Sequence, residues 1–187
     1  IFSGILQLLF NAADVIVVGR FAGSQSLAAV GSTTALINLM INIFIGLSVG
    51  VNVIVARYYG AKREKDVQDT IHTAMALSIV SGLFLIILGQ LLSRPMLELM
   101  GTPDDVIDKS TIYMRIIFIG MPANMIYNFG SAILRAVGDT KRPLYFLTAA
   151  GVINVVLNLF FVIMFRMDVA GVSLATAISQ AISAFLV

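Results

Sequence analysis

The chain has 187 residues, of which 59% are hydrophobic and only 12% are charged, and it contains no cysteine. Soluble domains carry about 25% charged residues, so a soluble fold of this size could not cover its surface with polar groups. In a membrane, the apolar surface can face lipid tails, so it needs no polar cover. The lack of cysteine excludes disulfides and thiolate metal sites. The net charge of +2 is small and says little about partners. For a chain of this membrane class we expect no nucleic-acid partner.

The chain contains six apolar segments, and a membrane-spanning helix needs roughly 20 apolar residues. We therefore predict an all-α, polytopic transmembrane helix bundle with six membrane helices. In chain order, these helices are expected at about 1–18, 27–56, 67–93, 102–134, 142–165 and 169–187. The first and last helices are expected to be truncated, because Ile1 and Val187 both lie inside apolar runs. Pro122 is expected to kink the fourth helix and to free a backbone carbonyl.

The links between these segments alternate in charge. More than half of the 12 basic residues lie in the link at 57–66 and the link at 135–142. Because Lys and Arg are enriched in cytoplasmic links, both of these links are predicted to be cytoplasmic, and the first helix is predicted to run outward. We expect a multi-pass protein surrounded by membrane lipids in the plasma membrane, which in a bacterium is the cytoplasmic membrane.

Some of the predicted helices extend beyond the bilayer, and their membrane parts include about 71–92 in the third and 112–134 in the fourth. Asp14 is the only acidic residue within the membrane parts, and a charge in the bilayer core costs about 2.5–3.5 kcal/mol or more. It precedes Arg20 by about 9 Å of helix rise. One interpretation is an acid close enough to the outer interface to reach water. The other is a carboxylate that faces a protein cavity and binds a cation or a proton. Either binding event would neutralise a buried charge and could trigger a helix rearrangement.

The depth of other polar residues favours the second interpretation. On the fifth helix, Asn158 and Asn154 lie about 12 and 18 Å below Arg166, and their spacing of four residues points them the same way. On the sixth helix, Thr176 lies about 12 Å below Asp168. Oxygen ligands of these kinds suit a hard cation such as Na⁺. The predicted cation or proton site consists of Asp14, Asn154, Asn158 and Thr176. The alternative is that the amides and the hydroxyl only form hydrogen bonds between helices.

Two further sets of residues within the spans predict how the helices meet. The first set consists of candidates for lining a cavity or for hydrogen bonds between helices: Asn38, Asn42, Asn124, Asn128 and Gln180. The second set consists of small residues that recur every four positions in the sixth helix: Gly171, Ala175, Ser179 and Ser183. Small residues at this spacing let helix backbones approach closely in lipid.

Four motifs follow one another in order along the chain. They are NAADVIVVGRFAG (11–23) with LAAVG (27–31), ARYYGAK (56–62), RAVGDTKRP (135–143) and VAGVSLAT (169–176). They resemble the first helix and first outer loop, the second-to-third loop, the fourth-to-fifth loop and the start of the sixth helix of the multidrug and toxic compound extrusion family, MATE. The resemblance covers essentially the whole chain.

This resemblance implies a twelve-helix antiporter of two six-helix lobes, in which residues 1–187 form the N-terminal lobe and the C-terminal lobe is missing. Such a protein would be a transporter, not an enzyme, and would need no cofactor. It would export drugs or other amphipathic or cationic small molecules in exchange for Na⁺ or H⁺ by alternating access. In that family, a first-helix Asp and polar residues of the fifth and sixth helices form a cation site. Those positions match Asp14, Asn154, Asn158 and Thr176. Some members carry a second Asp where this chain has Asn158, which leaves the coupling ion open.

Three alternatives to an antiporter remain open. One is a purely structural membrane subunit, which retained transport after removal of the charge at Asp14 would favour. A flippase of lipid-linked oligosaccharides has a related architecture, but it would be expected to carry basic residues in its cavity. The membrane parts of the predicted helices lack them apart from the peripheral Arg115. An intramembrane protease would need a serine such as Ser131 with a base within hydrogen-bond reach. His72 is the only candidate base, and no second orienting group accompanies it.

Overall fold

The computed structural model describes residues 2–187, and these residues form helices and no strand. The elements are α1 (Phe2–Val17), η1 (Val18–Ala22), α2 (Ser24–Gly60), α3 (Glu64–Leu99), α4 (Asp104–Ile119), α5 (Met121–Ala136), α6 (Lys141–Leu159), η2 (Phe160–Met164) and α7 (Val169–Leu186). The short segments η1 and η2 are π-helical turns that continue α1 and α6. The prediction of an all-α fold is confirmed.

Four helices within residues 2–187 are long and apolar enough to cross a membrane, namely α2, α3, α6 with η2, and α7. The pair of α4 and α5 makes a fifth span when the two are taken together. The helix α1 has 16 residues, continues directly into the five residues of η1, and packs along α6. The polytopic helix bundle is confirmed.

The fourth predicted helix is divided at Gly120 into α4 and α5, which meet at an angle of 47°. Pro122 lies in the first turn of α5, where its missing N–H and its ring interrupt the hydrogen bonding of a continuous helix. Gly82 of α3 packs directly on the bend, because a Cβ at this position would overlap the backbone of Pro122. The bend therefore gives α3 and α5 a close backbone contact.

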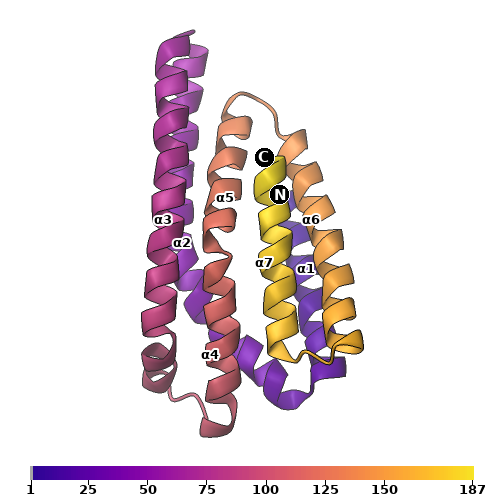
Figure 1. The fold of residues 1–187 in the computed structure, drawn as a ribbon. Coiled ribbons are helices and arrows are strands. Elements are labelled where there is room, and N and C mark those ends of the chain that lie inside the picture. Colours follow the sequence, from indigo (N-terminus) through magenta and orange to yellow (C-terminus); the bar gives the residue numbers. More distant parts are fainter. Residues whose placement is uncertain (1) are drawn as a thin grey trace.

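The helices stand in two groups joined by a bent one. Figure 1 shows α2 and α3 on one side of the bundle, α1, α6 and α7 on the other, and α4 and α5 between them. The larger hydrophobic core lies between α2, α3, α4 and α5, where Leu85, Phe118 and Phe129 are fully buried. A second core cluster, which includes Val18 and Val172, joins α1, α2, α4 and α7 at the end where η1 and η2 lie.

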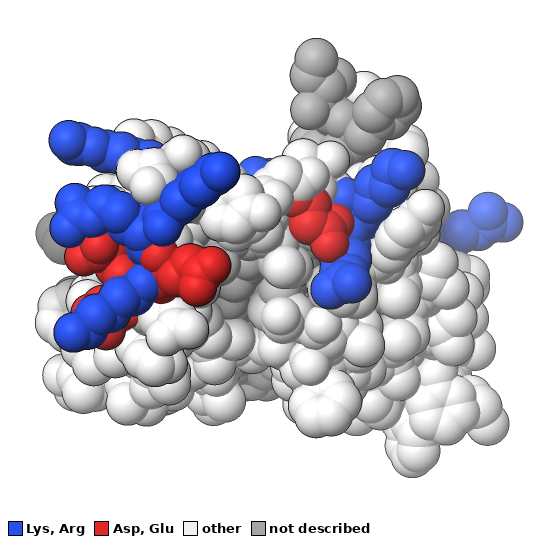
Figure 2. Space-filling model, turned by 90° about the horizontal axis from the view of Figure 1, so that it is seen from above, with Lys and Arg blue, Asp and Glu red and all other residues white. Residues whose placement is uncertain are grey.

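The link between α2 and α3 and the link between α5 and α6 lie at the same end of the bundle, at the top of Figure 1. Figure 2 looks onto this end and shows Lys and Arg side chains in separate groups, with Asp and Glu among them. Arg63 pairs with Asp66, and Arg142 pairs with Asp139. The folded chain thus gathers the basic links of the sequence at one end, which is the inner end in the predicted orientation.

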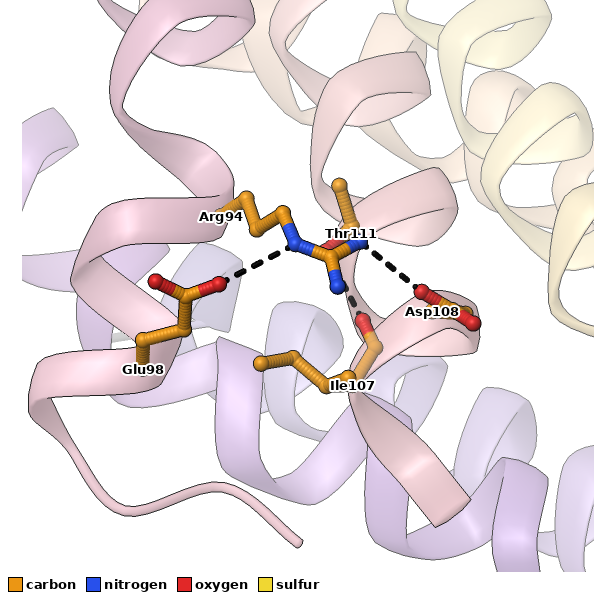
Figure 3. A network of polar contacts seen from close by, with 5 residues as sticks. All are labelled: Arg94, Glu98, Ile107, Asp108 and Thr111. Atoms are coloured by element: carbon orange, nitrogen blue, oxygen red, sulfur yellow. Dashed lines mark hydrogen bonds and ion pairs between the residues drawn. The ribbon is translucent and has the colours of Figure 1, made fainter. Parts of the chain in front are cut away.

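At the opposite end, called the outer end below, ion pairs join neighbouring helices. Arg94, near the end of α3, lies between Glu98 of the same helix and Asp108 of α4, at 3.1 and 3.0 Å (Figure 3). These side chains are largely exposed, and exposed ion pairs contribute about 0–1 kcal/mol to stability. The pairs therefore align the ends of α3 and α4 more than they stabilise the fold.

A second outer contact holds the start of α7. Lys109 of α4 donates to the Asp168 carboxylate at 2.5 Å, and the Ser26 hydroxyl of α2 donates to its other oxygen. Burial alone would raise the pKa of Asp168, but the hydrogen bonds from Lys109 and Ser26 outweigh it and lower the pKa below its ordinary value. Three helices thus meet at one carboxylate.

We expect Asp168→Asn to lower the free energy of unfolding of the full-length protein by about 1 kcal/mol at neutral pH, a value reduced for partial exposure. Because the carboxyl has a lower pKa in the folded state, its contribution is present at neutral pH and is lost as the pH falls through that lowered pKa. Thermal unfolding in detergent should therefore separate wild type from variant at neutral pH, and the two should converge on acidification. A difference that stayed constant with pH would contradict this assignment.

Candidate cation site and cavity

The four predicted site residues form one chain of hydrogen bonds across α1, α6 and α7. The Asn158 amide donates to the Asp14 carboxylate and, at 3.0 Å, to Asn154 Oδ1. The Asn154 amide donates in turn to Thr176 Oγ1 at 3.2 Å and to Ser179 Oγ at 3.4 Å. The structure therefore brings the four side chains together, and their role in binding an ion stays a prediction.

The approach of α1 to α6 depends on Gly151. A Cβ at this position would overlap the ring of Phe10 on α1. Phe10 precedes Asp14 by one helical turn, and Gly151 precedes Asn158 by two turns, so each pair lies on one face of its helix. The lack of a side chain at Gly151 lets α1 lie close enough for Asp14 to contact Asn158.

The site is largely shielded from solvent. Asn154 is 6% exposed and Asn158 is fully buried, whereas Asp14 is half-buried and borders a cavity. Within residues 2–187, Asp14 forms no ion pair with a basic side chain. A carboxylate that is bonded by a neutral amide in such a setting lacks the partner that a buried charge requires. This setting is the reason to consider Asp14 a candidate for pairing with a cation or a proton.

Both helices that carry this contact leave regular α-helical geometry beside it. The π-helical turn η1 begins four residues after Asp14, and η2 begins two residues after Asn158. The two turns contact each other at the outer end. Such π-helical turns occur frequently at functional sites, so the outer edge of the candidate site has the backbone irregularity that functional sites often show.

A cavity of about 390 Å³ lies between α1, α2, α4, α5 and α7, and Asp14 and Thr176 both border it. All five candidate cavity residues also line it: Asn38, Asn42, Asn124, Asn128 and Gln180. Apolar side chains, including Ile37, Ile41 and Met121, form the surface between them. The wall combines one carboxylate with neutral hydrogen-bonding groups on an apolar background, which suits an amphipathic organic molecule.

Several polar residues around the site were not predicted from the sequence. Ser179 belonged only to the predicted packing stripe, although its hydroxyl also contacts Asn154. Asn11 and Thr34 line the cavity, and their positions one turn before Asp14 and Asn38 were a signal that could have identified them. Tyr113 of α4 also lines the cavity, and no local pattern marked it.

The sequence matches known proteins along nearly its whole length. The MatE family model matches residues 1–160. The chain belongs to the MatE family. A curated relative, the "Probable multidrug resistance protein YoeA" of Bacillus subtilis (strain 168), is 34% identical over 189 residues, which cover 99% of this MatE chain and 41% of that protein.

The fold of this MatE chain is similar to solved structures in two states. One is an inward-facing conformation of a multidrug resistance MATE family transporter of the MOP superfamily, with a TM-score of 0.90 and 27% identity over 96% of this chain and 41% of that one. The other is an outward-facing conformation of such a transporter, with a TM-score of 0.91 and 27% identity over 98% of this chain and 40% of that one. The MatE chain thus spans about two fifths of the length of the proteins it matches.

Proposed function

We propose that the full-length protein is a cation-coupled antiporter, driven by Na⁺ or H⁺, that exports drugs or other amphipathic or cationic organic compounds. The observation that carries this proposal is the setting of Asp14. Its carboxylate borders a cavity, accepts from a neutral amide, and has no basic partner within residues 2–187. An acid in a membrane span marks an ion or substrate pathway by default.

Coupling follows if the ion and a cationic substrate compete for Asp14. Asp14 is the only carboxylate among the residues that line this cavity, so the wall can neutralise one positive charge at a time. An ion that binds Asp14 from the outside would take the place of the cationic group of the substrate at this carboxylate. The substrate would then be released more readily. A ligand can drive such a change only if it binds the two states differently, and competition for one charge supplies that difference.

The similarity to both an inward-facing and an outward-facing transporter supports alternating access. The chain matches the two conformations almost equally well, with TM-scores of 0.90 and 0.91. We infer that the region keeps its internal structure and moves as a rigid body against the rest of the protein. The chain would be the N-terminal lobe, and the missing C-terminal lobe would complete the cavity wall.

The proposed setting is the plasma membrane, with the links at 57–66 and 135–142 in the cytoplasm. Large apolar side chains are exposed on several helices outside the cavity, as at Ile16, Leu39 and Val80, each more than 60% exposed. Lipid tails would cover these side chains. This supports membrane lipids as the surrounding partners of the lobe.

Neither the flippase nor the protease gains support from the site. The residues that line the cavity include no Lys or Arg to hold the pyrophosphate of a lipid-linked oligosaccharide. His72 is exposed on α3, and the buried Ser131 hydroxyl of α5 has no hydrogen bond to it in the described part of the chain. A serine without a base within reach is not activated as a nucleophile.

We expect the full-length protein in liposomes to export a fluorescent organic cation such as ethidium when an inward Na⁺ or H⁺ gradient is imposed. The two gradients are applied separately, and the external dye is followed by fluorescence. Stimulation by one gradient, and its loss when that gradient is dissipated, would identify the coupling ion. Dye movement that is insensitive to both gradients would contradict the proposed antiport.

A further inference from the structure

The hydroxyls that contact Asn154 can act only as acceptors toward it. Thr176 Oγ1 donates its hydrogen to the Val172 carbonyl at 3.0 Å, and Ser179 Oγ donates its hydrogen to the Thr176 carbonyl at 2.9 Å. A hydroxyl has one hydrogen and two acceptor lone pairs. Both hydroxyls on α7 therefore donate their single hydrogen to a backbone carbonyl of the same helix. Toward Asn154 each hydroxyl oxygen can only accept.

This arrangement sets the direction of every hydrogen bond in the row of side chains that runs from α7 through Asn154 and Asn158 to Asp14. The Asn154 amide nitrogen must face the two hydroxyls, so its Oδ1 faces Asn158 and accepts from it at 3.0 Å. The two hydrogens of the Asn158 amide are then directed to Asn154 Oδ1 and to Asp14. Asn158 Oδ1 is left buried without a hydrogen-bond partner among the described residues.

The side of Asp14 that faces α6 is therefore covered by a donor group. A cation bound between Asp14 and α6, or the O–H of a protonated Asp14 turned toward α6, needs an oxygen at this place instead of an N–H group. Rotation of the Asn158 amide about its last side-chain bond, which is a soft torsion, would supply Oδ1. That rotation would bring Asn158 Oδ1 against Asn154 Oδ1 unless Asn154 turned as well. The two hydroxyls on α7 oppose the turn of Asn154.

We propose that Ser179 is a positioning residue for ion loading, which acts through Asn154 to hold Asn158 with its amide nitrogen on Asp14. This inference rests on the proposed antiport. The hydrogen bonds that fix the amides of Asn154 and Asn158 must break before Asn158 Oδ1 can coordinate the ion. Ser179 thereby weakens ion binding and keeps it reversible.

Ser179→Ala removes one of the two acceptors that orient Asn154. We expect the half-saturating concentration of the coupling ion to fall about fivefold, the effect of one neutral hydrogen bond. The maximal rate at saturating ion should be retained, because no group of the cavity wall is lost. A residue that only packed α7 against α6 would change stability without changing the ion dependence.

Ser183→Ala is the matched control. Ser183 lies one turn further along the same buried face of α7, is 5% exposed, and donates its hydroxyl to the Gln180 carbonyl at 2.8 Å. It takes no part in the hydrogen bonds that connect Asp14 with α7. Both variants remove a buried serine hydroxyl, but only the hydroxyl of Ser179 contacts Asn154.

The experiment titrates ethidium efflux by the full-length protein in liposomes, against Na⁺ at fixed pH and against pH without Na⁺. We expect Ser179→Ala to shift the midpoint for the ion that drives the wild type, whereas Ser183→Ala keeps the wild-type midpoint. Equal midpoints in the two variants would overturn the inference while leaving antiport intact. Wild-type efflux that responds to neither ion would instead refute the proposed antiport itself.

Discussion

Asp14→Asn in the full-length protein is expected to abolish ion-driven efflux while leaving membrane insertion intact. The variant keeps the size of the side chain and a hydrogen-bonding group beside Asn158, but it removes the charge. Asp14 is the one carboxylate that borders the cavity, and without it neither a proton nor Na⁺ can be held against the substrate. We expect dye efflux to fall to the level of liposomes without protein.

The measurement compares Asp14→Asn with Asp104→Asn at equal amounts of inserted protein. Asp104 is an exposed acid in the first turn of α4 at the outer end. Its loss changes the net charge equally and removes only a favourable interaction with the helix dipole, worth about 0.3–1 kcal/mol. Efflux at the wild-type rate by Asp14→Asn would refute the role of this carboxylate, and equal loss in both variants would point to a general effect of charge.

The second large effect is expected from Gly151→Ala, which adds a single methyl group between α1 and α6. The new Cβ would overlap the Phe10 ring, so the ring or the whole of α1 must move. Overpacking of a close contact costs about 1–3 kcal/mol. Because Asp14 lies one turn from Phe10, displacement of α1 would lengthen its contact with Asn158, and we expect ion-driven efflux to fall about tenfold, in line with losses from small misplacements.

Two further variants separate this packing effect from other causes. Gly31→Ala also adds a methyl group to a helical glycine, but its Cβ would meet no atom within 4 Å, so we expect wild-type efflux. In the double variant with Phe10→Ala, the space left by the ring accommodates the new methyl group, and we expect part of the efflux to return. Independent, additive losses in the double variant would show that the contact between these positions does not matter.

The course of the backbone was largely readable from the sequence. Long uncharged runs predict membrane helices because hydropathy is a property of consecutive residues, and α2 and α3 occupy two of these runs. Pro122 marked the bend because its chemistry is local. The angle of 47° at Gly120 was not readable, since it also depends on Gly82 of α3, which is distant in sequence and packs on the bend.

The candidate site was readable in part. Depth in the membrane follows from counting residues along each helix, and depth placed Asp14, Asn158 and Thr176 at comparable levels. Rotation of each helix about its own axis does not follow from that count. The contact of Ser179 with Asn154, and the single direction of the hydrogen bonds toward Asp14, therefore came only from the folded arrangement.

By itself, the sequence determined that this chain is a bundle of membrane helices with an acid in the first of them, because length, hydropathy and charge are summed along the chain. The tertiary structure alone decided that Gly151 admits the Phe10 ring, that Asn158 turns its amide nitrogen to Asp14, and that one cavity collects carboxamides from several helices. The physical reason is that these contacts depend on how helices approach and rotate against each other, and close packing between distant segments sets both.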